Sequence, residues 1–382
     1  MNSVISLLKT NNLLSIAAAV LICGMAAACQ NKSAENSEEA SPPEDVLKLT
    51  SGENNPRNSE GDFVTLKDGR ILYIYSHYTG TSASDHASAY LAGRYSSDNG
   101  KTWTANDVKI VDQEGTMNVM SVSLLRMQNG NIALFYLRKN STFDCIPMMR
   151  ISKDEAKTWS EPRPCITDGE GYFVLNNNRV IQLKNGRLLF AVSLHQSPGD
   201  TVFARRGRLW SYYSDDNGTT WTASAEVPNP EEIVTQEPGL VEVANGDILM
   251  FSRTMSNVQY FSHSKDKGET WSAVEPGNLK SPCSPASIAR IPSTGDLLVV
   301  WNDNGVDQKR TPLNIAISKD EGKTWINNKI FENDPKGSYC YTAIHFTEDE
   351  DVLLGYFNWA TTGVTIKKID LDWVYQAVTA VQ

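Results

Sequence analysis

Three arginines stand far apart in the chain, at Arg57, Arg253 and Arg310. A guanidinium group binds a carboxylate through two parallel hydrogen bonds, so arginines that a fold gathers around one point form a specific site for a carboxylate ligand. The alternative for each arginine is an ion pair with a local acid on a solvated rim. The choice between the two depends on the elements that position these side chains.

One short segment recurs five times and identifies those elements. It is written SSDNGKTW from Ser96, SKDEAKTW from Ser152, SDDNGTTW from Ser214, SKDKGETW from Ser264 and SKDEGKTW from Ser318. In this S-x-D-x-G-x-T-W pattern, the Asp-box motif, Asp accepts backbone N–H groups across a hairpin turn, Gly takes the left-handed conformation and Trp packs between sheets. Ala156 replaces Gly in the second copy and predicts a strained or altered turn. A calcium loop would need further acidic ligands, which none of the copies supplies.

The repeat predicts a propeller. Its tryptophans lie 50 to 62 residues apart, close to the size of a four-stranded blade. Between the repeats, strand pairs around tight turns occur at FVTLKDGRILYIYS, VSLLRMQNGNIALFYLR, RVIQLKNGRLLFAVSLH, GLVEVANGDILMFSR, SIARIPSTGDLLVVWN and AIHFTEDEDVLLGYFN. Six hairpins predict an all-β, six-bladed propeller of four-stranded antiparallel blades over residues 49–382, with five Asp boxes and a decayed box, KIDLDW, in the last blade.

This layout brings the chemical groups to one mouth. The repeats and the first hairpin turns share one face, so the opposite face collects the starts of the innermost strands and the loops between second and third strands. There the three arginines meet acids and tyrosines: Glu60, Asp62, Asp85, Glu237, Tyr339 and Tyr341. His77 and His195 end second strands, His86 follows Asp85, and Asn178 opens the third blade, so these are further candidates for contacts with a sugar.

The N-terminus and the composition indicate an exported protein. Residues 1–28 have the layout of a lipoprotein-type signal, with an apolar run LLSIAAAVLICGMAAA before Cys29, the expected lipidated residue; residues 29–48 are polar and predict a disordered tether. We therefore expect a lipid-anchored protein of a bacterial cell envelope, periplasmic or at the cell surface, held to the membrane by this anchor alone. A net charge of −10 argues against nucleic acid. Four cysteines remain in the folded body, as disulfides or free buried thiols: Cys145, Cys165, Cys283 and Cys340.

The Asp boxes and the spacing of the chemical residues resemble the bacterial exo-α-sialidases of the neuraminidase superfamily, from about Asn54 to Tyr356. In that family an arginine opens blade 1, an acid/base Asp follows in the next loop, and a helper Glu precedes the second arginine by sixteen residues. Arg57, Asp85, Glu237 and Arg253 match this order, and the third arginine, Arg310, lies eight residues before Ser318. The nucleophilic tyrosine that opens blade 6 resembles Tyr341, with Tyr339 as the alternative two residues away on the same side of a strand.

The resemblance implies a mechanism and a substrate. A retaining exo-α-sialidase would use Tyr341 as nucleophile, Glu237 to activate it, Asp85 as acid/base and the three arginines to hold the sugar carboxylate, without a metal or cofactor. Its partners would be sialylated or related acidic-sugar glycans. The family's R-I-P is replaced by Arg57, Asn58 and Ser59, and His86 follows Asp85. These departures leave open a glycoside hydrolase for another 2-keto-3-deoxy or acidic sugar. Because a fold alone does not establish activity, a non-catalytic carbohydrate-binding propeller is a further alternative.

Overall fold

The computed structural model describes residues 40–378. The predicted export signal, Cys29 and the first part of the predicted tether lie outside the described residues. The part of the chain that is described contains no helix long and apolar enough to cross a membrane.

The described chain is built from antiparallel sheets, which confirms the predicted all-β class and its four-stranded units. The first sheet has the order β2 (Asn58–Thr65), β3 (Ile71–Tyr78), β4 (Ala89–Ser96) and β5 (Val108–Val111). Two later sheets repeat the same pattern, with β15 (Thr235–Glu242), β16 (Ile248–Thr254), β17 (Val258–Ser264) and β18 (Glu275–Lys280), then β19 (Ser287–Arg290), β20 (Leu297–Trp301), β21 (Leu313–Ser318) and β22 (Ile326–Glu332).

A nine-stranded sheet lies between the first and the later sheets in the sequence. One part contains β6 (Asn118–Arg126), β7 (Ile132–Lys139), β8 (Cys145–Ser152) and β9 (Arg163–Pro164); the other contains β10 (Tyr172–Val174), β11 (Ile181–Gln182), β12 (Leu188–Gln196), β13 (Arg208–Ser214) and β14 (Thr222–Ala223). A single parallel pairing, Tyr172 with Cys145, joins the two parts. Each part alone therefore has the antiparallel pattern of the other sheets.

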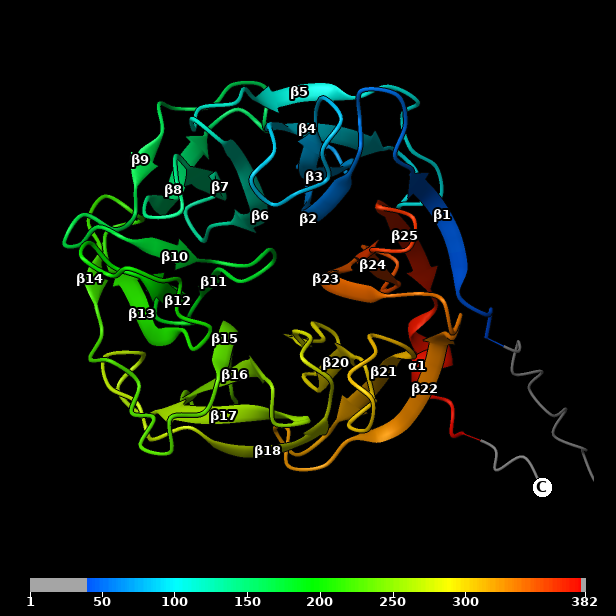
Figure 1. The fold of residues 1–382 in the computed structure, drawn as a ribbon. Coiled ribbons are helices and arrows are strands. Elements are labelled where there is room, and N and C mark those ends of the chain that lie inside the picture. The colour runs from blue at the N-terminus through cyan, green and yellow to red at the C-terminus, as the bar shows by residue number, and fades with distance from the viewer. Residues whose placement is uncertain (1–39, 379–382) are drawn as a thin grey trace, which may run out of the picture. The chain divides into compact units, whose positions relative to one another are not determined.

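The sheets surround a common centre, as Figure 1 shows for the coloured part of the chain. Inner strands of neighbouring sheets contact each other in the pairs β2 with β6, β15 with β19 and β19 with β23 (Tyr339–Phe346). β12 contacts β15, and Asn178 N donates to the Val122 carbonyl of β6 at 3.0 Å. β2 also contacts β23, so the first and last sheets are neighbours. The hydrophobic core lies between neighbouring sheets; for example, Leu72 and Leu91 pack with Val122 and Leu134. Burial of apolar area between adjacent sheets thus fixes the position of each inner strand.

The five repeated segments form turns with one shared hydrogen-bond pattern. In the first, Ser96 Oγ accepts from Gly100 N at 2.9 Å, while Asp98 accepts from Thr102 N at 2.8 Å and from the Thr102 hydroxyl at 2.6 Å. The same three bonds recur in the other four segments. Ala156 keeps the pattern by adopting φ 60°, so the turn type does not change and the strain is taken by the left-handed alanine.

Two expectations about the chain ends were wrong. Residues Glu44–Leu49 were assigned mainly to the tether, but they form β1, which pairs antiparallel with β25 (Gly363–Ile369). The last sheet has the order β1, β25, β24 (Val352–Asn358) and β23. KIDLDW is not a hairpin turn, because Asp370 caps the short helix α1 (Leu371–Tyr375) by accepting from Asp372 N. The outer strand therefore comes from the other end of the chain.

Candidate active site

Four of the inner strands have a β-bulge in their first half. The register shifts within β2, β6, β15 and β23, and a non-glycine residue adopts positive φ there: Glu60 at 55°, Ser121 at 60°, Glu237 at 45° and Tyr341 at 58°. A β-bulge turns a side chain away from the direction that strand alternation would give it. All four residues line one central cavity of ≈ 200 Å³, so the bulges aim them into it.

Tyr341 and Glu237 meet across this cavity. The Tyr341 hydroxyl donates a hydrogen bond of 3.3 Å to Glu237 Oε1, and Arg253 Nη1 donates one of 2.7 Å to Glu237 Oε2. Burial raises the pKa of Tyr341 well above its usual range, and the Glu237 carboxylate adds to this, while Arg310 and Arg253 oppose it. The phenol is therefore neutral at rest and stands beside a carboxylate that can accept its proton.

Arg310 lies against the same tyrosine. Its guanidinium carbon is 5.7 Å from the centre of the Tyr341 ring, and two of its nitrogens donate to the Cys283 carbonyl at 3.0 and 3.2 Å. A third contact runs from Arg310 Nη1 to Cys340 Sγ at 3.1 Å, and Arg253 Nε donates to Cys283 Sγ at 3.2 Å. The two cysteines thus orient the two arginines. Both thiols are free, as are Cys145 and Cys165.

Asp85 and Arg57 form a second charged group. Arg57 is fully buried and donates through Nη1 to Asp85, through Nη2 to Glu60 at 2.9 Å and through Nε to Ser59 Oγ at 3.0 Å. Burial acts to raise the pKa of Asp85, but the Arg57 guanidinium outweighs it and holds the pKa below its ordinary value. Asp85 is consequently ionised, and each of the three guanidinium nitrogens of Arg57 already donates a hydrogen bond within the protein.

Beneath the cavity, asparagines connect the inner strands. Asn177 Nδ2 donates to the carbonyl oxygens of Gly61 at 2.9 Å and Tyr341 at 3.0 Å. Asn178 Nδ2 donates to Asp62 Oδ1 at 2.8 Å, while its own oxygen accepts from Ile344 N at 3.2 Å. Asn178 was a predicted sugar contact, but it lies outside the cavity lining and links β2 to β23 through these hydrogen bonds. Its polar groups are used to hold the bulged strands together.

The three histidine predictions have different outcomes. His195 lines the cavity, but Nδ1 bonds the Ala204 carbonyl at 2.8 Å, Nε2 bonds Ser193 Oγ at 3.0 Å and the ring stacks on Phe203. Ser193 Oγ also accepts from Glu237 N at 3.4 Å, so His195 supports Glu237 rather than offering a free nitrogen. His77 lies outside the lining and pairs with Asp107 at 3.1 Å. His86 is exposed beside Asp85 and does not line the cavity either.

The bulge in β23 also separates the two tyrosines. Tyr339 pairs with Asn358 in the sheet and packs into the hydrophobic core, with its ring edge-on to Tyr356 at 6.0 Å. The expectation that both tyrosines face the same side is wrong, because the register shifts between Cys340 and Ala343. Only Tyr341 of the two reaches the cavity.

Several lining residues were not predicted as site residues. Glu60 was noted only as an acid near Arg57, yet it lines the cavity with 4 % of its side chain exposed. Lys139 is buried and donates to the Asp85 carbonyl at 2.8 Å, and the aromatic rings of Tyr172 and Phe203 form part of the wall. Lys139 ends a second strand, the same position that identified His195, so the strand-end pattern could have found it.

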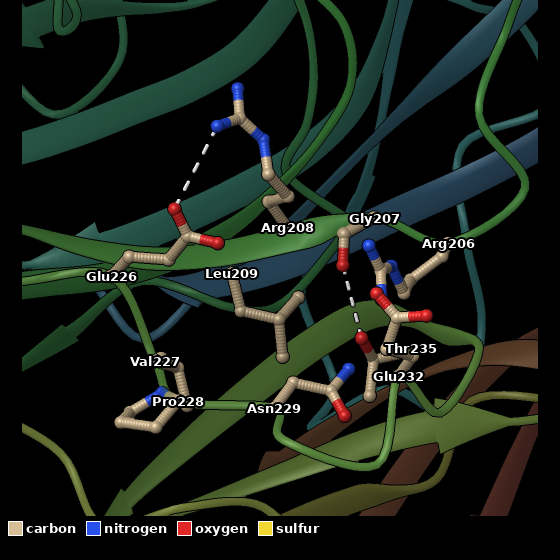
Figure 2. Close-up of a pocket in the computed structure, with 10 residues that line it drawn as sticks. All are labelled: Arg206, Gly207, Arg208, Leu209, Glu226, Val227, Pro228, Asn229, Glu232 and Thr235. Atoms are coloured by element: carbon tan, nitrogen blue, oxygen red, sulfur yellow. Dashed lines mark hydrogen bonds and ion pairs between the residues drawn. The ribbon is translucent and has the colours of Figure 1, made fainter.

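A separate hollow outside the central cavity contains none of the predicted residues. Figure 2 shows its lining, in which Arg208 faces Glu226 at 3.7 Å. Arg206 lies 2.9 Å from Glu232 in the same hollow. Its arginines already have carboxylate partners, so the charge pattern gives no reason to place an anionic ligand there. Among residues 40–378, no group of three His, Cys, Asp or Glu is placed to hold a metal ion.

The fold and the cavity define a class of protein: an all-β, propeller-like ring whose central pocket is lined by a tyrosine, three carboxylates and Arg253. Arg57 and Arg310 lie behind the lining and contact Asp85 and Tyr341. The sequence matches the family described as BNR repeat-like domain over residues 105–357, and the BNR/Asp-box repeat over residues 94–105. The chain belongs to this BNR-repeat family. The predicted resemblance to bacterial sialidases is confirmed.

Individual relatives agree with the family. A sialidase from Vibrio cholerae is 27 % identical over 49 % of this chain and 26 % of its own length, and one from Clostridium perfringens is 26 % identical over 66 % of this chain and 71 % of its own. The chain thus spans about a quarter of the Vibrio cholerae relative. The solved structure of a Hadza microbial sialidase superposes with a TM-score of 0.70 at 18 % identity, covering 84 % of this chain and 66 % of that structure, which shows the fold.

Proposed function

We propose that the protein is a retaining exo-α-sialidase that releases terminal sialic acid from glycoconjugates through a tyrosine nucleophile. The observation that carries this proposal is the contact of the Tyr341 hydroxyl with Glu237, flanked by Arg253 and Arg310. The sialidase relatives, which match parts of this chain at low identity, support the same activity.

Each group has a role that its chemistry suits. The anomeric carbon of a 2-keto acid glycoside carries a carboxylate, which would repel a carboxylate nucleophile; a neutral phenol avoids this repulsion. Glu237 takes the phenolic proton as Tyr341 attacks, and Arg253 and Arg310 hold the sugar carboxylate together with Arg57, the third arginine that the resemblance assigns to it. Asp85 gives a proton to the departing glycosidic oxygen and then activates the water that cleaves the sugar–tyrosine bond.

The architecture and location are part of the same proposal. Counting the two parts of the nine-stranded sheet separately gives six blades, and the five repeated turns with their shared serine–aspartate bonds are the five Asp boxes. Under this proposal, residues 1–28 act as an export signal and a lipid on Cys29 anchors the protein in a bacterial envelope; the apolar run before Cys29 supports this.

One observation favours a second candidate, a hydrolase for another 2-keto-3-deoxy or acidic sugar. Arg57, which the family resemblance assigns to the substrate carboxylate, is fully occupied by Glu60, Asp85 and Ser59. If Arg57 keeps these partners, only Arg253 and Arg310 bind the substrate carboxylate. A site with two such arginines need not select the same acidic sugar as a site with three.

Both candidates are tested with purified protein and fluorogenic aryl α-ketosides of several nonulosonic and ulosonic acids. Release of fluorophore from the N-acetylneuraminic acid substrate with retained anomeric configuration, seen by NMR, supports the sialidase. Activity only on another acid sugar supports the second candidate. Binding without turnover on any of them would contradict both and leave a carbohydrate-binding protein.

A further inference from the structure

The arrangement around Arg57 contains a conflict with the role proposed for Asp85. A general acid must carry a proton when substrate is bound, but Arg57 holds the pKa of Asp85 below its ordinary value. Asp85 is also in the position where Arg57 would receive a ligand carboxylate, because Nη1 donates to it directly. The resting structure therefore blocks both the acid and the arginine.

The two carboxylates that share Arg57 differ in how easily they can move. Glu60 has 4 % of its side chain exposed and is held at both oxygens, by Arg57 at 2.9 Å and by Ser121 Oγ at 3.1 Å. Asp85 has 54 % of its side chain exposed, and its carboxylate contacts Arg57 alone among the hydrogen-bonding groups of residues 40–378. An incoming anion would thus displace Asp85 and leave Glu60 in place.

The backbone of Asp85 is fixed independently of its carboxylate. Lys139 Nζ donates to the Asp85 carbonyl oxygen at 2.8 Å, and Asn118 Nδ2 donates to the same oxygen at 2.9 Å and to the Ala87 carbonyl at 2.8 Å. Loss of the Arg57 contact therefore frees only the side chain. Arg57 itself stays in place, because its guanidinium lies 4.6 to 4.9 Å from the ring centres of Tyr78, Phe357 and Trp359 and remains paired with Glu60.

We infer that Asp85 occupies the place of the substrate carboxylate at rest, that the substrate carboxylate exchanges with it at Arg57, and that Glu60 is the positioning residue that keeps Arg57 ready for this exchange. The inference rests on the proposed function. After the exchange, Asp85 has lost its guanidinium partner and has gained a neighbouring carboxylate, so it takes up a proton from solvent and becomes the acid that the reaction needs. Besides Arg57, the charged or titratable groups of residues 40–378 that interact with it are Lys139, His86, Glu60, Tyr78 and Tyr172.

The test measures protons taken up on binding. The probe is 2,3-didehydro-2-deoxy-N-acetylneuraminic acid, a carboxylate that is not hydrolysed, titrated calorimetrically near pH 6 in MES and in cacodylate, which differ in ionisation enthalpy and carry no carboxylate. Wild type should take up at least about 0.3 proton per site. If the protein cleaves a different acidic sugar, the sugar it releases is the probe.

Two variants assign the proton. Asp85→Asn should bind the probe about three- to ten-fold tighter at neutral pH, because a competing carboxylate is gone, and should take up no proton. Glu60→Gln should bind about ten-fold more weakly yet still take up a proton, which a purely structural role would not produce. Binding by wild type without uptake, or uptake lost in Glu60→Gln and kept in Asp85→Asn, would overturn the exchange and leave the proposed function standing. Absence of both binding and hydrolysis for every acidic sugar would instead overturn the proposed function.

Discussion

Replacing Tyr341 with phenylalanine removes one oxygen from the cavity and leaves the ring under Arg310. The hydroxyl makes one hydrogen bond, of 3.3 Å, to Glu237, so its loss should change the free energy of unfolding by no more than about 1 kcal/mol. Activity should respond differently, because the hydroxyl is the atom that forms the proposed covalent bond. We expect turnover to fall by on the order of 10³ or more, equivalent to ~4 kcal/mol of activation free energy.

Tyr339→Phe is the matched control. It makes the same chemical change two residues away, in a core position against Tyr356, so turnover should remain within about two-fold and the free energy of unfolding should change by no more than about 1 kcal/mol. The assays are hydrolysis of an aryl α-ketoside, thermal unfolding, and intact mass after reaction with a 2,3-difluoro derivative of the cleaved sugar. A label on Tyr339, or full activity in Tyr341→Phe with a normal fold, would refute the assignment; inversion of configuration would refute the covalent route.

Four further outcomes follow from the structure. Arg310→Lys keeps the charge but loses the fork, so kcat/KM should fall by about 10², and an unchanged value in a steady-state assay would make Arg310 structural. Asp85→Asn should slow substrates with poor leaving groups far more than aryl glycosides, which need little protonation; equal losses across a leaving-group series would contradict an acid role. Burial raises the pKa of Glu60 from 4.5 to about 7 despite Arg57, so the stability that Glu60 contributes is full below about pH 4.5 and is lost as the pH rises through 7. The melting temperature of Glu60→Gln should therefore decline less than that of wild type between about pH 5 and 8, and parallel curves would contradict this. Cys29→Ala should move the protein out of the membrane fraction, and unchanged fractionation with an unmodified mature terminus would contradict lipidation.

The sequence predicted the parts of the fold that local chemistry determines. Alternating apolar residues and turn residues located the hairpins, and the S-x-D-x-G-x-T-W pattern located turns whose bonds are made within the segment itself. The pairing of β1 with β25 could not be read this way, because Glu44–Leu49 has an outer, largely exposed pattern that resembles the polar tether before it.

The site was predictable where residue spacing carried the signal, as for Glu237 and Arg253. It was not predictable where a bulge decides direction. Glu60 and Tyr341 adopt left-handed backbone conformations that their side-chain types do not favour. The local sequence therefore does not predict the bulges at these positions. Strand alternation alone places Tyr339 and Tyr341 on one side, and it also gives no indication that the nitrogens of His195 are already bonded within the protein.

The pairing of β1 with β25 affects when the molecule can fold. Ser41 N donates to Asp370, 329 residues further along the chain. β1, which is synthesised before the other strands, pairs only with β25, which follows all of them. Contacts of such high sequence separation form slowly, since loop closure must precede any gain from the contact. The ring therefore cannot close before β25 has been made. If the chain is exported as its signal predicts, β1 emerges before β25, and until β25 follows, β1 is an unpaired strand that a chaperone would have to shield.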